Sequence, residues 1–358
     1  MGWWQVNADT LAGSRFVLSP LAETFGSLKL LHAARGSHPG ERAWLDAHLP
    51  AYRRLLADDP VTALLVRSGL GPEWIADFLT PTPRGTPTPQ DTGGTSGTGG
   101  TSGTGSTSGT GSTGDGPHES FAVEVARVRD ASPLDARAHL RLALRGAPLP
   151  AALDRDDLPR RAADLLTHVW TEAVLPYWPR RRRVLEADVV SRLALLSQGG
   201  WAAALDTLRP GTRWLGENRL QVNAHEYPPR EISGAELFFV PITAQRHGWV
   251  SWEEPHRYAV VYPCSGALAG AGHGPRSVPG SLGALIGPAR AGVLLLLGSP
   301  MSTSQLVAVT GQGLGSVGRH LRVLLDAGLV SRRRAGRSVL YHRSPAGEVL
   351  VRAVRAEP

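Results

Sequence analysis

Apolar residues recur at helical spacing through most of the first two hundred positions. After Ser19, which suits an N-cap, and Pro20, which suits a first turn, this spacing predicts an amphipathic helix. The apolar residues that define it are Leu21, Phe25, Leu28 and Leu31. The same period predicts further helices over about 41–56, 59–68, 120–145 and 156–199. Pro176 and Pro179 interrupt the last of these stretches.

The pattern changes to short β-rich runs from about Thr212. TRWLGENRLQV alternates around a Gly-Glu-Asn turn, and AELFFVPI and YAVVYP are runs of β-branched and aromatic residues. We expect three or four short strands that form one small antiparallel sheet and end near Pro263.

A stretch without apolar residues divides the chain. Residues 81–117 begin with PTPRGTPTPQ and continue as Gly-Thr-Ser repeats, a composition typical of a flexible linker. The predicted organisation is therefore a helical N-terminal segment (1–80), a disordered linker (81–117), a regulatory region of helices and a small sheet (118–281), and a C-terminal domain (282–358).

The C-terminal domain combines three helical runs with a hairpin. The helices are predicted at 288–297, 303–309 and 314–327, and the strands at 329–331 and 338–342 around a tip at 332–337. Ser302 would cap the second helix, and Gly328 would end the third. This order is that of a winged helix-turn-helix. The fold class predicted for the whole chain is α+β, mainly α.

The net charge of +7 lies entirely in this domain. Residues 1–286 hold 28 basic and 28 acidic side chains, whereas residues 287–358 hold ten arginines and three acidic residues. Lys29 is the only lysine, so the use of arginine rather than lysine carries no information here. The asymmetry does, because a basic terminal domain on a neutral body is typical of nucleic-acid binding.

The third helix of the domain is expected to read DNA. At 100° per residue, one face collects Leu314, Val317, Leu321, Leu324 and Leu325 for packing. The opposite face carries Ser316, Arg319 and Arg322, as a recognition helix in the major groove would. We expect Arg319 and Ser316 to contact bases, with Gln312 at the helix entrance, and Arg322 to contact a phosphate.

The hairpin forms the predicted wing, which would lie on the DNA backbone or in the minor groove. His320, at the edge of the recognition helix, could support packing, contact a phosphate or read a base. The predicted DNA-binding residues are Ser302, Thr303, Gln312, Ser316, Arg319, His320, Arg322, Arg332, Arg333, Arg334 and Arg337.

At these residues the sequence resembles a known family. TSQLVAVTGQGLGSVGRHLRVLLDAGLVSRRRAGRSVLYH is similar to the DNA-binding core of ArsR-type winged-helix repressors, most specifically in SVGRHLRVLLDAGLV. The resemblance covers about a fifth of the chain and implies a homodimer that reads two half-sites. Gly318 stands where the family motif has a second serine, which removes one hydroxyl from the expected DNA contacts.

The resemblance does not extend to metal sensing. Metal-sensing members use a cysteine pair before the recognition helix or His and Asp ligands on the last helix, and this chain has neither. SRFVLSPLAETFGSLKLL, YWPRRRRVLEAD and the LFFVPI and VVYP strands also resemble an actinobacterial-type subgroup of these regulators. Its members carry an uncharacterised region ahead of the winged helix.

Other chemistries have little support in the sequence. One cysteine excludes a disulfide scaffold and a Cys-based zinc ribbon. We find no 18-residue apolar run, no signal peptide, no His-Glu-x-x-His and no Gly-x-Ser-x-Gly elbow between a strand and a helix. A Gly-x-Gly-x-x-Gly match at 313–318 follows a helix rather than a strand. We expect a cytoplasmic protein that is not an enzyme and has no cofactor or metal.

Three features keep an alternative open. Arg180–Arg183 could be a second polyanion contact or a solvated helix turn. Cys264 could be a reactive thiol or a buried one. Trp170, Tyr177, Trp178, Trp201 and Trp214 could line an apolar ligand pocket or pack in the core.

The sequence thus predicts a sequence-specific transcriptional regulator that represses as a homodimer bound to double-stranded DNA. An unidentified small-molecule effector is a candidate partner, and no membrane partner is expected. The alternatives are a winged-helix protein-interaction module and an enzyme with a DNA-binding tail.

Overall fold

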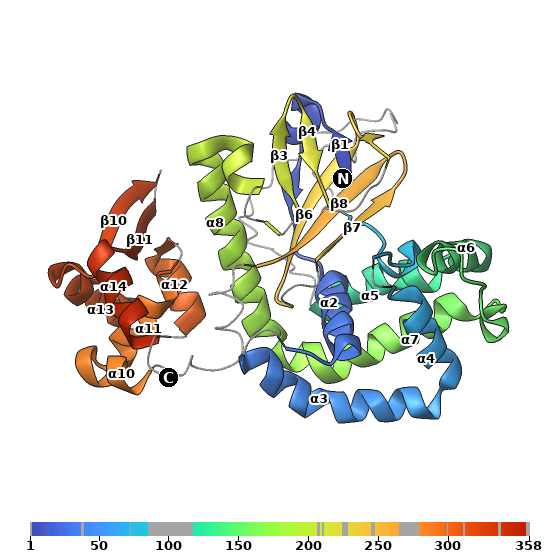
Figure 1. The fold of residues 1–358 in the computed structure, drawn as a ribbon, viewed down its shortest axis with the longest axis horizontal. Coiled ribbons are helices and arrows are strands. Elements are labelled where there is room, and N and C mark those ends of the chain that lie inside the picture. Colours follow the sequence, from blue (N-terminus) through green and yellow to red (C-terminus); the bar gives the residue numbers. More distant parts are fainter. Residues whose placement is uncertain are drawn as a thin grey trace, which may run out of the picture.

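The protein, seen in a computed structural model, consists of a helical body, two sheets and a C-terminal module (Figure 1). The described residues are 2–36, 39–71, 73–84, 117–205, 208–209, 211–223, 228–244, 248–264, 279–298, 300–310, 312–335 and 338–355. Most of the predicted linker therefore lies outside the described residues.

The N-terminal helices form where the periodicity predicts them. Ser19 caps the long helix α2, because its Oγ accepts the Ala22 N–H at 2.9 Å. Asp59 caps α4 in the same way through the Thr62 N–H at 3.1 Å. The elements are α1 (Ala8–Ala12), α2 (Pro20–Ala33), α3 (Pro39–Asp58), α4 (Pro60–Gly69) and the short turn η1 (Asp77–Leu79).

The helices after the linker complete the body. They are α5 (Pro117–Arg129), α6 (Pro133–Ala143), the turn η2 (Ala151–Leu153), α7 (Leu158–Val169), the π turn η3 (Trp170–Val174), η4 (Leu175–Tyr177) and α8 (Trp178–Leu205). The two prolines of the interrupted stretch lie in η4 and in the first turn of α8, where a missing N–H costs least. Helix α8, which is interrupted at Gly200, lies between the sheets and the C-terminal module (Figure 1).

Two four-stranded mixed sheets replace the single antiparallel sheet that the sequence predicts. One has the strand order β3-β4-β1-β5 and the other β2-β6-β8-β7. Their strands are β1 (Trp3–Gln5), β2 (Arg15–Phe16), β3 (Arg213–Gly216), β4 (Arg219–Gln221), β5 (Arg230–Glu231), β6 (Glu236–Ile242), β7 (Trp249–Glu253) and β8 (Arg257–Pro263).

The prediction of one antiparallel sheet is wrong both in the number of sheets and in the direction of some strands. Strand β6 pairs in parallel with β8 and with β2, and β1 pairs in parallel with β5. The N-terminal strands β1 and β2 have only three and two residues, too few to show a period of two. Their partners lie more than 200 positions away, so no local pattern could reveal the pairing.

The β3–β4 hairpin forms at the predicted Gly-Glu-Asn turn. Glu217 and Asn218 take φ values of 49° and 60°, as both central residues of a type I′ hairpin turn must.

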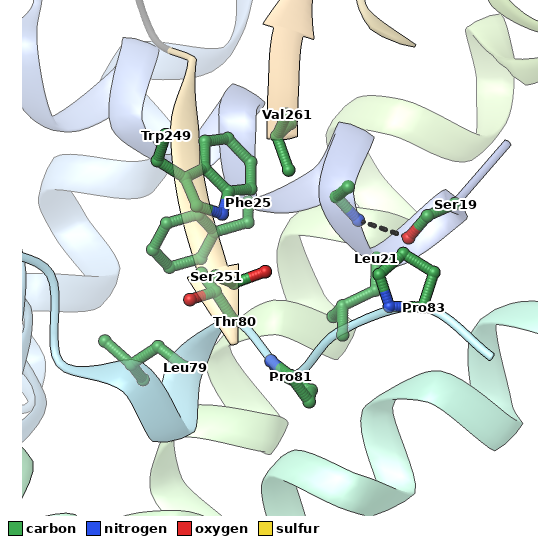
Figure 2. Close-up of a pocket in the computed structure, with 11 residues that line it drawn as sticks. Ser19, Leu21, Phe25, Leu79, Thr80, Pro81, Pro83, Trp249, Ser251 and Val261 are labelled. Atoms are coloured by element: carbon green, nitrogen blue, oxygen red, sulfur yellow. Dashed lines mark hydrogen bonds between the residues drawn. The ribbon is translucent and has the colours of Figure 1, made fainter. Parts of the chain in front are cut away.

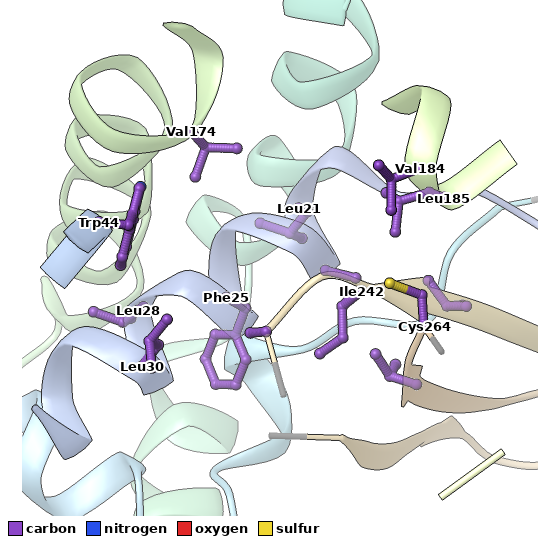
Figure 3. Packing of buried hydrophobic residues seen from close by; sticks show 14 of the residues in the cluster. Leu21, Phe25, Leu28, Leu30, Trp44, Val174, Val184, Leu185, Ile242 and Cys264 are labelled. Carbon is purple, nitrogen blue, oxygen red and sulfur yellow. The ribbon is translucent and has the colours of Figure 1, made fainter. Parts of the chain in front are cut away.

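Buried apolar residues join α2, α3, α5, α7 and α8 to one face of the second sheet. Phe25, Leu28, Trp44, Leu185 and Ile242 lie in this cluster, and Cys264 is buried beside them (Figure 3). Burial raises the pKa of the Cys264 thiol well above its usual range, which favours an inert thiol over a reactive one.

The tryptophans divide between two cores instead of lining one pocket. Trp170 stacks on Phe121 with ring centroids 4.7 Å apart and meets Trp178 edge-on at 5.3 Å. Trp201 and Trp214 pack instead against the second cluster, which covers the other sheet face. The arrangement supports core packing for these side chains.

The chain is tightly packed where α2 meets the second sheet. Leu21, Phe25, Leu79 and Trp249 surround a hollow of about 10 Å³ (Figure 2). That volume holds at most about one water molecule.

Residues 81–84, assigned to the linker by composition, belong to this packed region. Thr82 is buried, and its N–H donates to Glu253 Oε1 at 2.9 Å. Arg127 donates to the Thr82 carbonyl. These long-range partners, together with the buried ring of Pro83, hold the start of the proline-rich segment in place.

The arginine run at 180–183 is partly structural. Arg181 is 3% exposed, and its Nη1 donates to Glu23 Oε1 and to Ser27 Oγ, each at 2.7 Å. Arg182 pairs with Glu186 one turn along α8. Arg181 cannot therefore serve as a polyanion contact, because it is enclosed and already paired.

Within the described residues, no helix is both long and apolar enough to cross a membrane.

Candidate nucleic-acid interface

The C-terminal module, residues 279–355, forms a helical cluster with a three-stranded sheet. Its elements are α10 (Gly280–Ile286), α11 (Pro288–Leu296), β9 (Met301–Ser302), α12 (Thr303–Thr310), α13 (Leu314–Asp326), β10 (Val330–Ala335), β11 (Ser338–Arg343) and α14 (Pro345–Arg355). The predicted helices and hairpin strands are present, with ends shifted by one to a few residues. Gly328 takes φ +68° directly after the Ala327 C-cap, as the predicted terminating glycine requires.

Arg343 fixes the geometry between helix α11 and the hairpin. Its Nε donates to Leu294 O at 2.8 Å and its Nη2 to Leu295 O at 2.6 Å, which satisfies carbonyls at the end of α11. Its Nη1 lies 3.1 Å from Glu348 Oε1 on α14. The scaffold that carries α13 and the hairpin is thus held by a buried guanidinium.

Helix α13 packs against α11 and α12 through the predicted face, with one exception. Val317, Leu321 and Leu324 are buried, and Leu325 is partly buried. Leu314, predicted to face inward, is 63% exposed. It is the first residue of the helix and lies beyond the reach of the neighbouring helices, so the angular argument fails at this position.

The exposed face of α13 carries the predicted cations. Arg319 and Arg322 are exposed. Gly315 and Val323, on the same side of the helix, are exposed as well. Ser316 and Gly318 are half-buried. Gly313, the N-cap, gives no side-chain hydrogen bond, so the first backbone N–H groups of α13 are capped by no side chain.

Three predicted residues meet at the start of α13. Ser316 Oγ lies 3.5 Å from Gln312 Oε1 and 3.3 Å from His320 Nε2. This chain of polar groups follows one edge of the helix and orients the serine hydroxyl. It brings the helix entrance and the first two turns into a single polar strip.

The surroundings of His320 favour its neutral form. Burial lowers its pKa, and the charges of Arg290 and Arg319 lower it further. A neutral imidazole can accept or donate a hydrogen bond at this position.

Sequence reasoning missed Arg290, which lies on α11 and donates to the Ile286 carbonyl. Its effect on His320 places a third cation near the strip. Its position on the preceding helix gave no signal, because the angular analysis covered only α13.

The wing arginines lie in a strand and not at a hairpin tip, which corrects the predicted boundary. Arg332, Arg333 and Arg334 pair with Tyr341, Leu340 and Val339 of β11. All three arginines are exposed. Because side chains alternate along a strand, Arg332 and Arg334 share one face of the hairpin and Arg333 takes the other. Arg337 lies outside the described residues.

Ser302 and Thr303 lie at the other side of the sheet. Ser302 is in β9, a strand absent from the sequence prediction, and pairs with Leu340. Thr303 begins α12 directly after it. None of the described contacts joins these two residues to the polar strip of α13.

The exposed arginines of this surface differ from those of the body. Among the described residues, no acidic side chain forms an ion pair with Arg319 or Arg322, or with the three arginines of β10. In the body, arginines with an acidic partner include Arg127, Arg137, Arg145, Arg161, Arg181 and Arg257. The α13 and β10 arginines are therefore exposed cations that are available to an external anion.

Residues 285–333 match the family described as a helix-turn-helix domain. The chain carries a helix-turn-helix domain. The match spans α11, α12, α13 and the first part of β10, and so contains the polar strip and all of the exposed arginines except Arg334. No curated protein and no solved structure matches the chain. Helix-turn-helix domains bind DNA, so the match indicates DNA as a partner and regulation of transcription as the role.

Across the described part of the chain, no group of three or more His, Cys, Asp or Glu side chains is arranged to hold a metal ion.

Proposed function

We propose that the protein is a sequence-specific transcriptional regulator of the ArsR type that represses as a homodimer on double-stranded DNA. The exposed arginines of α13 and β10, which have no acidic partner among the described residues, carry the proposal. Such guanidiniums release counterions from DNA when they pair with phosphates, which supplies affinity.

The specificity of the proposed regulator would come from the recognition helix α13. Arg319 lies at the centre of its exposed face, where a guanidinium can bond both acceptors of a guanine edge. Ser316 is oriented by Gln312 and His320, so its hydroxyl enters the groove with a fixed direction. The arginines of β10 would contact the backbone and add affinity without sequence preference.

The proposed dimer has a candidate contact surface on α10 and α14. These helices touch each other, and each presents a large apolar side chain to solvent: Leu285 is 66% exposed and Val349 is 64% exposed. Pairing with a second copy would bury both. We expect Val349→Glu to shift the protein from dimer to monomer in sedimentation. Val123→Glu, at a valine of similar exposure on the body helix α5, should leave the dimer intact. A wild-type protein that sediments as a monomer would contradict the dimer.

The first experiment is selection of DNA fragments by the purified full chain at two salt concentrations. We expect enrichment of one palindromic site and a steep fall of affinity with salt. The test variant replaces Arg319, Arg322 and Arg334 by glutamine and should lose most of this binding. Absence of any enriched site, together with unchanged binding by the triple variant, would contradict the proposed function and favour a protein-docking role.

A further inference from the structure

Two cations outside the DNA surface lie at the beginning of strand β7. The Lys29 ammonium, on α2, stands 5.3 Å from the centre of the Trp249 ring. The side chain of Arg209 passes Gly248, where a Cβ atom would lie 3.4 Å from Arg209 Cδ. Since Gly248 and Trp249 are neighbours in the chain, both cations meet at the same point of the second sheet.

The backbone leaves room at this point only for glycine. A Cβ on Gly248 would lie 2.7 Å from the Val261 carbonyl oxygen, closer than real contacts allow. On the helix side, a Cβ on Gly26 would lie 3.0 Å from Ile242 Cδ1, so α2 lies tight against the end of β6. Lys29 follows Gly26 by three positions, on the same face of α2. The tight packing therefore directs Lys29 towards β7.

Neither cation has an acidic partner among the described residues. Arg209 Nη2 donates to the Val222 carbonyl at 2.8 Å, but Nη1 is buried and has no hydrogen-bond partner within the described part of the chain. The described interactions of the Lys29 ammonium are with the Trp249 ring and with the charge of Arg209. Buried charges in proteins are paired, because an unpaired one loses its hydration without compensation.

Burial lowers the pKa of both side chains. Burial, with the positive charge of Arg209, lowers the pKa of Lys29 to about 8. Burial lowers the pKa of Arg209 to about 10. Both groups are still mainly protonated at pH 7, so the site carries close to two positive charges.

A cleft elsewhere in the body also contains arginines. It has a volume of about 430 Å³ and lies between η1, α6 and the turn after β7. Its two arginines, Arg127 and Arg230, are already paired with Glu253 and Glu254. The cleft therefore offers no free cation to an anion, unlike the Lys29 and Arg209 pair.

We propose that Lys29 and Arg209 together bind the carboxylate or phosphate group of a small molecule. An oxyanion between them would accept from the ammonium and from Nη1, and would neutralise two charges that have no acidic partner among the described residues. The guanidinium supplies the planar fork and the lysine a point charge.

The site is connected to the helix-turn-helix domain through α8, which consists of two helical segments that meet at a break at Gly200. Arg209 follows the end of α8 by four residues, and α8 packs against α12. An anion that repositions Arg209 would act on the end of α8 and so on the support of α12. This regulatory part rests on the proposed function; binding of the anion does not.

Anion binding can be measured without DNA. Full-length protein in Tris chloride is titrated calorimetrically with inorganic phosphate and, separately, with acetate, which distinguishes the two oxyanion sources. We expect binding of at least one probe and a rise of the melting temperature with its concentration. Lys29→Met and Arg209→Gln should weaken binding about tenfold or more. Arg213→Gln, an exposed arginine of β3, is the matched control.

Lys29 also gives a direct signal, since it is the only lysine in the chain. In protein labelled with ¹³C,¹⁵N-lysine, one side-chain resonance reports its titration. The bound oxyanion should raise the titration midpoint by about 1–3 pH units. A lysine buried for structural reasons alone would show no such response. Lys29→Arg keeps the charge and should retain part of the binding, which separates loss of the site from loss of the fold.

The outcomes separate the two proposals. No heat, no stabilisation and no shift of the lysine resonance with either probe would overturn the anion site, as would wild-type binding by Lys29→Met. With the selected DNA site, phosphate should change affinity beyond a potassium chloride control of equal ionic strength, and should do so in wild type but not in Lys29→Met. An equal effect in both would overturn the regulatory link. Failure to bind DNA while phosphate still binds would contradict the proposed function only.

Discussion

At the scale of single residues, the same side-chain type takes opposite roles according to its surroundings. Arg343 and Arg181 are enclosed and hold elements together through carbonyl and carboxylate partners. Arg319 and Arg334 are exposed and have no acidic partner among the described residues. Desolvation sets the difference, because a buried guanidinium must be paired whereas an exposed one is available to bind.

Arg319 is expected to read bases. Replacing it by alanine should cost about 1–3 kcal/mol of binding free energy on the selected site and should relax sequence preference. The measurement is a competition titration of specific against random DNA for wild type and Arg319→Ala. Equal losses on both kinds of DNA would show that Arg319 contacts only the backbone.

Arg334, in the wing strand, is expected to contact phosphate. Arg334→Ala should weaken binding evenly across sequences and should reduce the slope of log affinity against log salt by about one unit. Measuring affinity at several salt concentrations tests this. Arg129→Ala, on an exposed arginine of the body, is the control and should leave the slope unchanged. A sequence-dependent loss would assign base contact to the wing.

At the scale of elements, the recognition helix depends on a short apolar face. Three of its predicted core residues are buried, and the first, Leu314, is exposed because it precedes the part of the helix that its neighbours cover.

Two leucines of this helix should differ in their effect on stability. Leu321 is 1% exposed, so Leu321→Ala should destabilise the fold by about 2–5 kcal/mol through loss of burial and the cavity left behind. Leu314→Ala removes little buried surface and should change stability by less than about 0.5 kcal/mol. Denaturant unfolding of both variants makes the comparison. Similar losses would mean that Leu314 is covered in solution, for example by a second copy.

At the scale of the whole molecule, polar groups connect segments that are distant in sequence. Glu23 on α2 accepts from Arg181 on α8 and from the Thr243 N–H after β6, the latter at 2.8 Å. Glu124 on α5 accepts the Leu21 N–H at 2.8 Å and the Ser19 hydroxyl at 3.0 Å. These contacts bind segments from before and after the linker into one body.

Glu124 should make stability depend on pH. Burial raises its pKa to about 7, although hydrogen bonds from Leu21 and Ser19 and the charge of Arg127 act in the opposite direction. Between about pH 4.5 and 7 the folded protein holds a proton that the unfolded chain releases, so the free energy of unfolding falls as pH rises and levels off above 7.

Glu124→Gln removes this titration and keeps an acceptor oxygen. Relative to wild type, the variant should gain about 3 kcal/mol between pH 4 and pH 8. Denaturant unfolding at several pH values measures the difference, and Glu119→Gln, on the exposed face of the same helix, is the matched control. A difference that does not change with pH would contradict a raised pKa.

The sequence by itself determined the features that are encoded locally. Helical periods, the Ser19 cap, the Glu217–Asn218 turn and the buried face of α13 depend on residues within a few positions of one another. The charge asymmetry and the motif around Arg319 likewise need no tertiary information, and they indicated the helix-turn-helix domain that the family match supports.

Only the tertiary structure decided what depends on distant partners. The pairing of β1 and β2 with strands more than 200 positions away, the burial of Arg181 against Glu23 and the packing of Thr82 all arise from contacts that no local pattern records. The same is true of Lys29 and Arg209, which are 180 positions apart in sequence. They lie close together because α2 packs against the end of β6 and the chain after α8 returns to β7. Desolvation then lowers the pKa of both side chains.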